Sequence, residues 1–110
     1  MGHYYNDKDL AKFKNIRRVN EELGDKFFDY YNSTMKEGVL SAREKALIAL
    51  AVSHALKCPY CIDAYSSACL EKGADEAQMN EAVHVAAAMA AGITLVHGVQ
   101  MMNKVDDLMM

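Results

Sequence analysis

Two stretches of the sequence predict helices that carry apolar side chains on every side. Residues 46–52 read Ala-Leu-Ile-Ala-Leu-Ala-Val, and residues 83–96 are almost all apolar and carry no Asp, Glu, Lys or Arg. A helix that is hydrophobic all round must be buried, whereas a chain of 110 residues hides only roughly two-thirds of its surface when it folds alone. We therefore expect a homo-oligomer in which these helices pack between subunits. A single bundle with both helices at its centre is the alternative.

The second of these stretches also raises the question of a membrane span. Residues 82–102 carry no Asp, Glu, Lys or Arg, but they are rich in Ala and Gly and include His84, His97, Thr94 and Gln100. That is weakly apolar for a segment of about 20 residues, the length that a spanning helix needs. We expect the stretch to be buried in protein rather than in lipid, with His84 and His97 buried as well, and we expect no membrane partner.

Helix start and stop signals follow one another along the whole chain. Ser41 and Glu44 form a capping box, and Asp75 and Gln78 form a second one. No segment shows a sustained two-residue alternation, so no strand is expected. The sequence predicts a single all-α domain over residues 1–110, a bundle of about six helices. The expected helices cover residues 8–19, 21–37, 42–57, 59–72, 76–91 and 93–105, with a break at Gly92.

Charge and cysteine content narrow the class of protein. The net charge is −3, from 12 basic and 15 acidic residues without a basic stripe, so nucleic acid is not an expected partner. The first residues lack the pattern of a signal peptide. The chain has three cysteines, whereas a secreted disulfide scaffold has a larger and even number. We expect a protein of the reducing cytoplasm.

The motif Cys58-Pro59-Tyr60-Cys61 carries the chemistry. Proline favours the first position of a helix, which makes Cys58 the expected cap residue and puts Cys61 in the first turn. A helix start carries partial positive charge and free N–H groups, and both favour a thiolate over a thiol. Because the thiolate is the nucleophile, this position indicates redox-active cysteines, one of which attacks while the other resolves.

Three side chains near the motif are candidates for a supporting proton relay. Tyr65 lies four residues after Cys61, and His54 lies four residues before Cys58, so each is one helical turn away. A histidine can accept a thiol proton near neutral pH. Glu44 is the third candidate, although its place in the capping box favours a structural role. Tyr65 and His54 have structural alternatives too, as a half-buried aromatic ring and as a core histidine.

Zinc is the competing chemistry for these cysteines. Cys58, Cys61, His54 and Cys69 are four possible ligands, but structural zinc sites usually combine two closely spaced pairs, and no second pair exists. Cys69 lies about 16 Å further along a helix than Cys58, and it is expected to be a small buried hydrophobe. We therefore expect neither a metal nor any other cofactor.

The motifs together resemble a known family. Residues 40–52 (LSAREKALIALAV), the motif CPYCI, Gly73, residues 81–83 (EAV) and residues 95–98 (LVHG) are similar to the carboxymuconolactone decarboxylase superfamily on its AhpD-like alkylhydroperoxidase side. The resemblance covers about residues 20–103. More narrowly, the chain resembles peroxidase-like proteins associated with arsenosugar biosynthesis.

This resemblance implies an all-α fold that assembles as trimers or hexamers, and a thiol peroxidase without haem or metal. It implies that Cys61 meets the peroxide and that Cys58 closes the disulfide. Two positions depart from the family pattern: Tyr65 stands where the family has a histidine, and Ala46 stands where it has a glutamate. The usual proton relay is therefore absent, and His54 is the candidate to replace it. The decarboxylase branch normally lacks the CxxC motif, so that activity is not expected.

Three functions compete at this point. The leading prediction is a cytoplasmic CxxC-dependent peroxidase or disulfide reductase, with a hydroperoxide as substrate and a thiol or dithiol as reductant. The alternative is a non-peroxidatic enzyme or binding module on the same scaffold, acting on a thiol-reactive small molecule such as an arsenical. The third is a structural oligomer in which the CxxC motif is incidental.

Overall fold

The computed structural model describes residues 6–110, and every regular element in that part of the chain is helical. The elements are the 3₁₀-helix η1 (Asp7–Arg18) and the α-helices α1 (Glu21–Met35), α2 (Ala42–Ala55), α3 (Pro59–Glu71), α4 (Glu76–Val96) and α5 (Gly98–Met109). The predicted all-α fold is confirmed, and five α-helices with one 3₁₀-helix match the expected number of about six.

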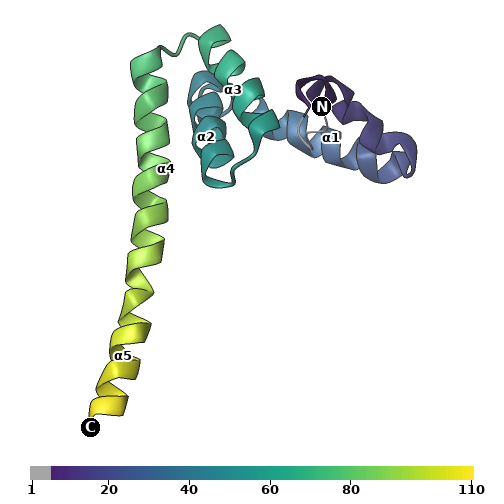
Figure 1. Ribbon diagram of the computed structural model, residues 1–110. Helices are drawn as coiled ribbons and strands as arrows, with labels where there is room; N and C mark the ends of the chain where they lie inside the picture. The colour runs from purple at the N-terminus through teal and green to yellow at the C-terminus, as the bar shows by residue number, and fades with distance from the viewer. Residues whose placement is uncertain (1–5) are drawn as a thin grey trace.

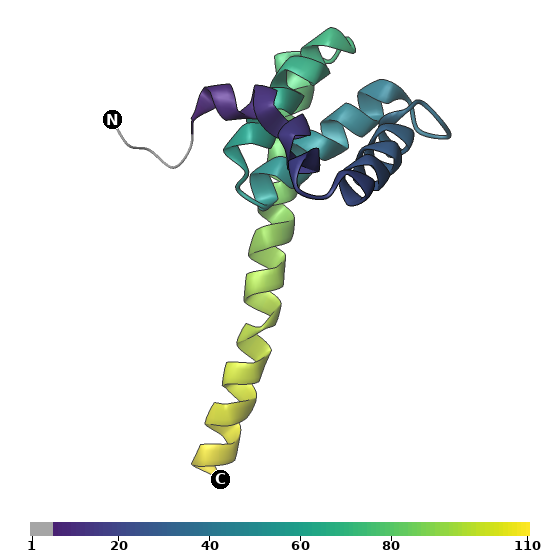
Figure 2. The ribbon, with the colours of Figure 1, turned by 90° about the vertical axis from the view of Figure 1, so that its right-hand side faces the viewer.

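The helices α2 and α3 form the centre of the molecule. Figure 1 shows α4 beside this pair on one side and the hairpin of η1 and α1 on the other side. The helix α5 continues α4, so that the two form one long rod that extends away from the rest of the chain and ends at the C-terminus (Figures 1 and 2). The motif Cys58–Cys61 lies where α2 turns into α3, between the hairpin and the centre.

Local capping signals set the helix starts as the sequence predicts. The Ser41 hydroxyl accepts the Glu44 backbone N–H at 3.0 Å, and Glu44 Oε1 accepts the Ser41 N–H at 2.7 Å. Asp75 and Gln78 form the same reciprocal pair at the start of α4. Each box satisfies donors that a helix start leaves without an intrahelical partner. The two capping boxes fix the residues at which α2 and α4 begin.

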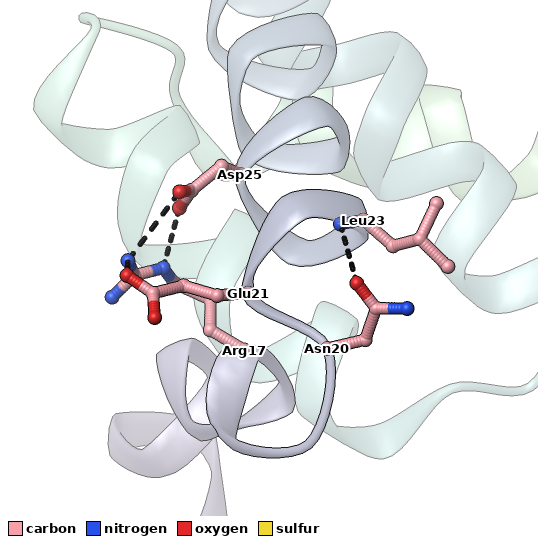
Figure 3. A network of polar contacts seen from close by, with 5 residues as sticks. All are labelled: Arg17, Asn20, Glu21, Leu23 and Asp25. Atoms are coloured by element: carbon pink, nitrogen blue, oxygen red, sulfur yellow. Dashed lines mark hydrogen bonds and ion pairs between the residues drawn. The ribbon is translucent and has the colours of Figure 1, made fainter.

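The hairpin of η1 and α1 is held by polar contacts (Figure 3) and by one close approach of its two backbones. The guanidinium of Arg17 donates to Asp25 and, at 2.9 Å, to Glu21. Gly24 of α1 is buried against the backbone of Arg17, and a Cβ at position 24 would lie 2.9 Å from the Arg17 Cα. Only glycine lets the two backbones come this close without displacement. Asn20 caps α1 by accepting the Leu23 N–H at 3.0 Å, as predicted.

The hydrophobic core of the single chain is small. Ala46 and Leu50 of α2, Cys69 of α3 and Ala74 of the following turn form it, and Cys69 is 0% exposed. Four half-buried residues pack around it: Leu47, Tyr65, Ala68 and Met79. The prediction that Cys69 is a packing residue is confirmed. The core joins α2, α3 and the start of α4. Further along α4 only Ala86 is buried, and α5 has no buried residue.

The chain is consequently far from spherical. Its radius of gyration is 18.9 Å, whereas a compact chain of this length has about 13 Å. A stripe of apolar side chains on α4 is more than half exposed: Val85, Met89, Ile93 and Val96. By length and composition, the rod Glu76–Met109 is also apolar enough to cross a membrane. The alternative of a single bundle that buries residues 83–96 is therefore wrong: Ala86 packs inside the chain at 9% exposed, but most of the stretch stays exposed.

Two smaller expectations for this rod are also wrong. The helix α4 runs through Gly92 to Val96, and the break comes at His97, whose N–H turns back to the Leu95 carbonyl. Glycine permits a break in a helix but does not force one. In the described part of the chain, no neighbouring atom lies within 4 Å of the Gly92 Cβ position, so no close packing contact distorts the helix there. His84 and His97 are exposed in the single chain rather than buried.

Candidate active site

The turn between α2 and α3 fixes the backbone of the CxxC motif. Lys57 adopts the left-handed conformation with φ of 56°, which reverses the chain after α2, and the Cys58 N–H donates to the Ser53 carbonyl at 3.0 Å. Pro59 occupies the first turn of α3, as predicted. The Tyr60 hydroxyl donates to Asp9 Oδ2 at 3.4 Å and ties the motif to η1. The motif is thus anchored to elements on both sides.

The two sulfur atoms of the motif lie within interaction distance of each other. Cys58 is the N-cap of α3, and its Sγ accepts the Cys61 backbone N–H at 3.3 Å. The Sγ atoms of Cys58 and Cys61 are 2.8 Å apart, and both residues are free, half-buried cysteines. The predicted positions of both residues at the helix start are confirmed. The arrangement brings a dithiol to a place where little movement separates it from a disulfide.

Electrostatics distinguish the two thiols. The hydrogen bond from the Cys61 side chain, followed by that from the Cys61 backbone N–H, lowers the pKa of Cys58. Burial, the hydrogen bond with Cys58 and the charge on Cys58 together raise the pKa of Cys61 to about 11. A hydrogen bond donated to a thiolate favours the charged form, and burial disfavours it. The first thiolate therefore forms on Cys58, although the family resemblance gives the first attack to Cys61.

Two pockets meet at the dithiol. The larger has a volume of about 600 Å³ and lies between α1, α2 and the start of α3. Its described lining residues are Phe13, Phe27, Tyr30, Tyr31, Thr34, Met35, Leu40, Lys45, Ile48, Ala49, Val52, Ser53, Leu56, Cys58, Cys61 and Tyr65. The smaller, of about 450 Å³, lies against η1 and is lined by Asp9, Leu10, Lys12, Phe13, Ile16, Cys58, Tyr60 and Cys61. The sulfur atoms are thus accessible from two directions, and the aromatic ring of Phe13 borders both pockets.

Three tyrosines, Tyr30, Tyr31 and Tyr65, line the larger pocket together with the thiols. Tyr65 was predicted, and it lines this pocket while its ring packs on the core. Tyr31 was not predicted as a site residue. Burial, and then the charge on Cys61, raises the pKa of Tyr31, so its phenol is protonated and lies within electrostatic reach of the sulfur atom. The sequence gives only a slight signal for Tyr31. It is a tyrosine on the apolar face of α1, where a phenylalanine would pack equally well.

The other two predicted relay residues lie in different surroundings. His54 Nδ1 is 2.9 Å from the Leu50 carbonyl oxygen, and His54 lines a separate hollow of about 170 Å³ between α2 and α4. Glu44 is exposed in its capping box, where the Ser41 backbone N–H lowers the pKa of its carboxyl group. Neither residue is among the described lining residues of the two dithiol pockets. Their part in proton transfer stays a prediction, and Glu44 has the structural role that the capping box predicts.

Cys69 lies apart from the CxxC motif, and the described residues form no metal-ligand cluster. Cys69 is buried in the core, where burial raises the pKa of its thiol. In residues 6–110, no three His, Cys, Asp or Glu side chains gather as metal ligands. The chemistry available at the site is therefore that of one thiolate and one neighbouring thiol, in a largely apolar pocket that three tyrosines and Lys45 also line.

Comparisons with known proteins agree with the resemblance seen in the motifs. The family described as "Carboxymuconolactone decarboxylase family" matches residues 21–104. The protein "Uncharacterized protein 4 in cox locus" of Paracoccus denitrificans is 33% identical over 101 residues, 92% of this chain and 91% of that protein.

Solved structures agree as well. A crystal structure of TM1620 from Thermotoga maritima covers 88% of this chain and 92% of its own, at 26% identity and a TM-score of 0.59. A second crystal structure of TM1620, with the same identity and TM-score and 89% of its own chain covered, is described as that of a "carboxymuconolactone decarboxylase family protein possibly involved in antioxidative response".

Proposed function

Because this chain belongs to the carboxymuconolactone decarboxylase family, we propose that it is a thiol peroxidase of the AhpD-like type, which reduces hydroperoxides through a Cys58–Cys61 disulfide. The observation that carries the proposal is the dithiol itself. Its sulfur atoms are 2.8 Å apart, Cys58 accepts a hydrogen bond at the start of α3, and both cysteines line an apolar pocket. The antioxidative role suggested for TM1620 agrees with this chemistry.

The first step is attack by the Cys58 thiolate on the terminal oxygen of the hydroperoxide. A sulfur–oxygen bond forms, the oxygen–oxygen bond breaks, and Cys58 becomes a sulfenic acid. The departing alkoxide takes the proton of the Cys61 thiol, so that an alcohol leaves and Cys61 becomes a thiolate. We propose that the protonated phenol of Tyr31, which lines the same pocket as both cysteines, donates a hydrogen bond to the departing oxygen.

The second step closes the disulfide. The Cys61 thiolate attacks the Cys58 sulfur, a sulfur–sulfur bond forms, and hydroxide leaves and takes a proton from solvent to become water. The two thiols have then supplied two electrons to one hydroperoxide. An external dithiol returns these electrons by thiol–disulfide exchange and is itself oxidised to a disulfide.

The test is the fate of each cysteine after exposure to a hydroperoxide. Fully reduced protein is mixed with one equivalent of hydroperoxide, quenched with iodoacetamide at successive times, digested and analysed by mass spectrometry. We expect a Cys58–Cys61 disulfide to accumulate while Cys69 stays reduced, because Cys69 is fully buried. A Cys61–Cys69 disulfide, or no oxidation of the motif under conditions that oxidise a small dithiol, would contradict the proposal. Cys58→Ser and Cys61→Ser are the matched controls.

A second candidate function rests on the same short distance between the sulfur atoms. Two thiols 2.8 Å apart are placed to bind one soft atom together, and trivalent arsenic is such an atom. The alternative is therefore a module that binds a thiol-reactive small molecule such as an arsenical. Tight, dithiol-dependent binding of arsenite together with no hydroperoxide turnover favours this candidate. Rapid turnover favours the peroxidase.

We also propose that the protein is a homo-oligomer, a trimer or a hexamer, in the cytoplasm. The apolar stripe of α4, which includes Val85, Met89 and Ile93, is more than half exposed in the single chain, and such a surface is typical of a contact between subunits. Light scattering measures the mass in solution directly. A folded, monodisperse particle of 12.2 kDa would contradict the proposal.

A further inference from the structure

The larger pocket is an elongated groove rather than a chamber around the sulfur atoms. Its floor is one face of α2 and the residue after it, because Lys45, Ile48, Val52 and Leu56 recur at three- and four-residue spacing. Lys45 precedes Leu56 by 11 residues, which is about 16 Å along a helix. Cys58 and Cys61 come two and five residues after Leu56. The groove therefore has a lysine at one end and the dithiol at the other.

The groove between these two ends is apolar and uncovered. Ile48 is 50% exposed, Val52 is 48% exposed and Leu56 is 76% exposed, although all three belong to the same lining. On the opposite wall, Phe27, Tyr31 and other residues of α1 present aromatic and apolar surface. An uncovered apolar groove of this shape fits an extended hydrocarbon chain, whose burial is favourable along its whole length.

The charge at the far end selects one kind of head group. Among the described lining residues, Lys45 carries the only charge. Its Nζ donates to the carbonyl oxygens of Thr34, at 2.7 Å, and of Lys36, which together hold it at the end of α1. An ammonium group has three N–H donors, so one is left, and neither carbonyl neutralises the positive charge. A carboxylate would supply both the third acceptor and the opposite charge.

From this arrangement we propose that the groove binds long-chain carboxylates, with the carboxylate at Lys45, the hydrocarbon along α2 and a hydroperoxide group at the dithiol. The inference rests on the proposed peroxidase function for its chemistry, and it names the substrate class as fatty acid hydroperoxides. The binding of the carboxylate and its chain does not require turnover, so the two can be tested separately.

The binding experiment uses palmitate, which has no reactive oxygen, and isothermal calorimetry on the reduced, full-length protein. Each methylene buried in the groove should raise affinity about fourfold, so a series of shorter saturated carboxylates should bind progressively more weakly. Lys45→Met should weaken palmitate binding about tenfold, which corresponds to about 1.4 kcal/mol. Lys45→Arg should restore it, and Lys72→Met, an exposed lysine outside both pockets, should leave it unchanged.

The kinetic experiment compares linoleic acid hydroperoxide with its methyl ester. Lys45→Met should raise KM for the acid about tenfold with kcat unchanged, and it should leave KM for the ester unchanged. Because Lys45 also holds the end of α1, the ester reports whether the groove itself stays intact in the variant. An equal effect on acid and ester would mean that Lys45 acts only on structure and would overturn the proposal.

The remaining outcomes separate the two proposals. If palmitate binds in a manner that depends on Lys45 but no hydroperoxide is turned over, the carboxylate site stands and the peroxidase function falls. If tert-butyl hydroperoxide and linoleic acid hydroperoxide are reduced equally well and palmitate does not bind, the peroxidase function stands and the carboxylate site is refuted. The second result is also expected if another copy of the chain fills the groove.

Discussion

The most direct test of the site is the reactivity of its two thiols toward iodoacetamide in the reduced, native protein. Cys58 and Cys61 have the same side chain, yet hydrogen bonds lower the pKa of Cys58, while burial, the hydrogen bond with Cys58 and the charge on Cys58 raise the pKa of Cys61 to about 11. Only the thiolate is alkylated at an appreciable rate. We therefore expect Cys58 to be labelled first.

The size of the difference follows from the thiolate populations. A thiol with a pKa of about 11 is about 0.01% ionised at pH 7, and one at the ordinary value of 9.0 is about 1% ionised. Because the pKa of Cys58 lies below 9.0, its thiolate exceeds that of Cys61 by at least about a hundredfold. The less basic thiolate is also the weaker nucleophile, and a Brønsted coefficient of about 0.4–0.5 returns about tenfold over two pKa units. The net preference for Cys58 is at least about tenfold.

The assay is a time course of alkylation at several pH values, read by peptide mass spectrometry. The midpoint of the pH dependence at Cys58 should lie below pH 9, whereas the rate at Cys61 should still be rising there. In Cys58→Ala, the charge and hydrogen bond that hold Cys61 protonated are gone, and burial alone remains, so its pKa should fall from about 11. In Cys61→Ala, the pKa of Cys58 should rise because it loses its side-chain donor. Faster labelling of Cys61 in the unchanged protein would refute the reasoning.

Three further predictions concern the fold. Gly24→Ala forces a Cβ to within 2.9 Å of the Arg17 Cα and should lower the free energy of unfolding by about 1–3 kcal/mol, measured by urea titration. Gly92→Ala, with nothing within 4 Å of its Cβ position, should instead stabilise α4 by roughly 0.5–1 kcal/mol; a loss would mean that the rod needs Gly92 to bend or pack. Glu44→Ala removes the acceptor of the Ser41 N–H, so it should lower the melting temperature at neutral pH and leave the rate of peroxide-driven thiol oxidation unchanged. This stabilising effect should disappear as the pH falls through the lowered pKa of Glu44.

The features that the sequence predicted correctly depend on residues close together in the chain. The Ser41–Glu44 box and the position of Cys58 as the cap of α3 each involve residues three positions apart. Such signals act through the backbone of one turn, and tertiary structure seldom overrides them. For this reason the helix starts, and with them the geometry of the CxxC motif, could be read directly from the order of residues.

The features that could not be predicted depend on packing between helices. Tyr31 reaches the surroundings of Cys61 only because α1 lies against α2 and α3, and no local pattern gives that arrangement. Its spacing in sequence made His54 a candidate partner of Cys58. The chain reverses at Lys57 and His54 lines the hollow beside α4, so its part in proton transfer stays a prediction. Sequence distance measures proximity along one helix, and it loses that meaning across a turn.

The surface proposed for subunit contact and the groove that leads to the dithiol lie on different helices. Figure 1 shows the rod of α4 and α5 on one side of the central pair and the hairpin of η1 and α1 on the other. The groove lies between α1 and α2, while the exposed stripe with Val85 and Met89 lies on α4. An oligomer formed through α4 alone would bury the stripe while the groove stayed open to substrate. Neighbouring subunits can therefore bury the exposed apolar side chains of α4 without closing the entrance to the dithiol.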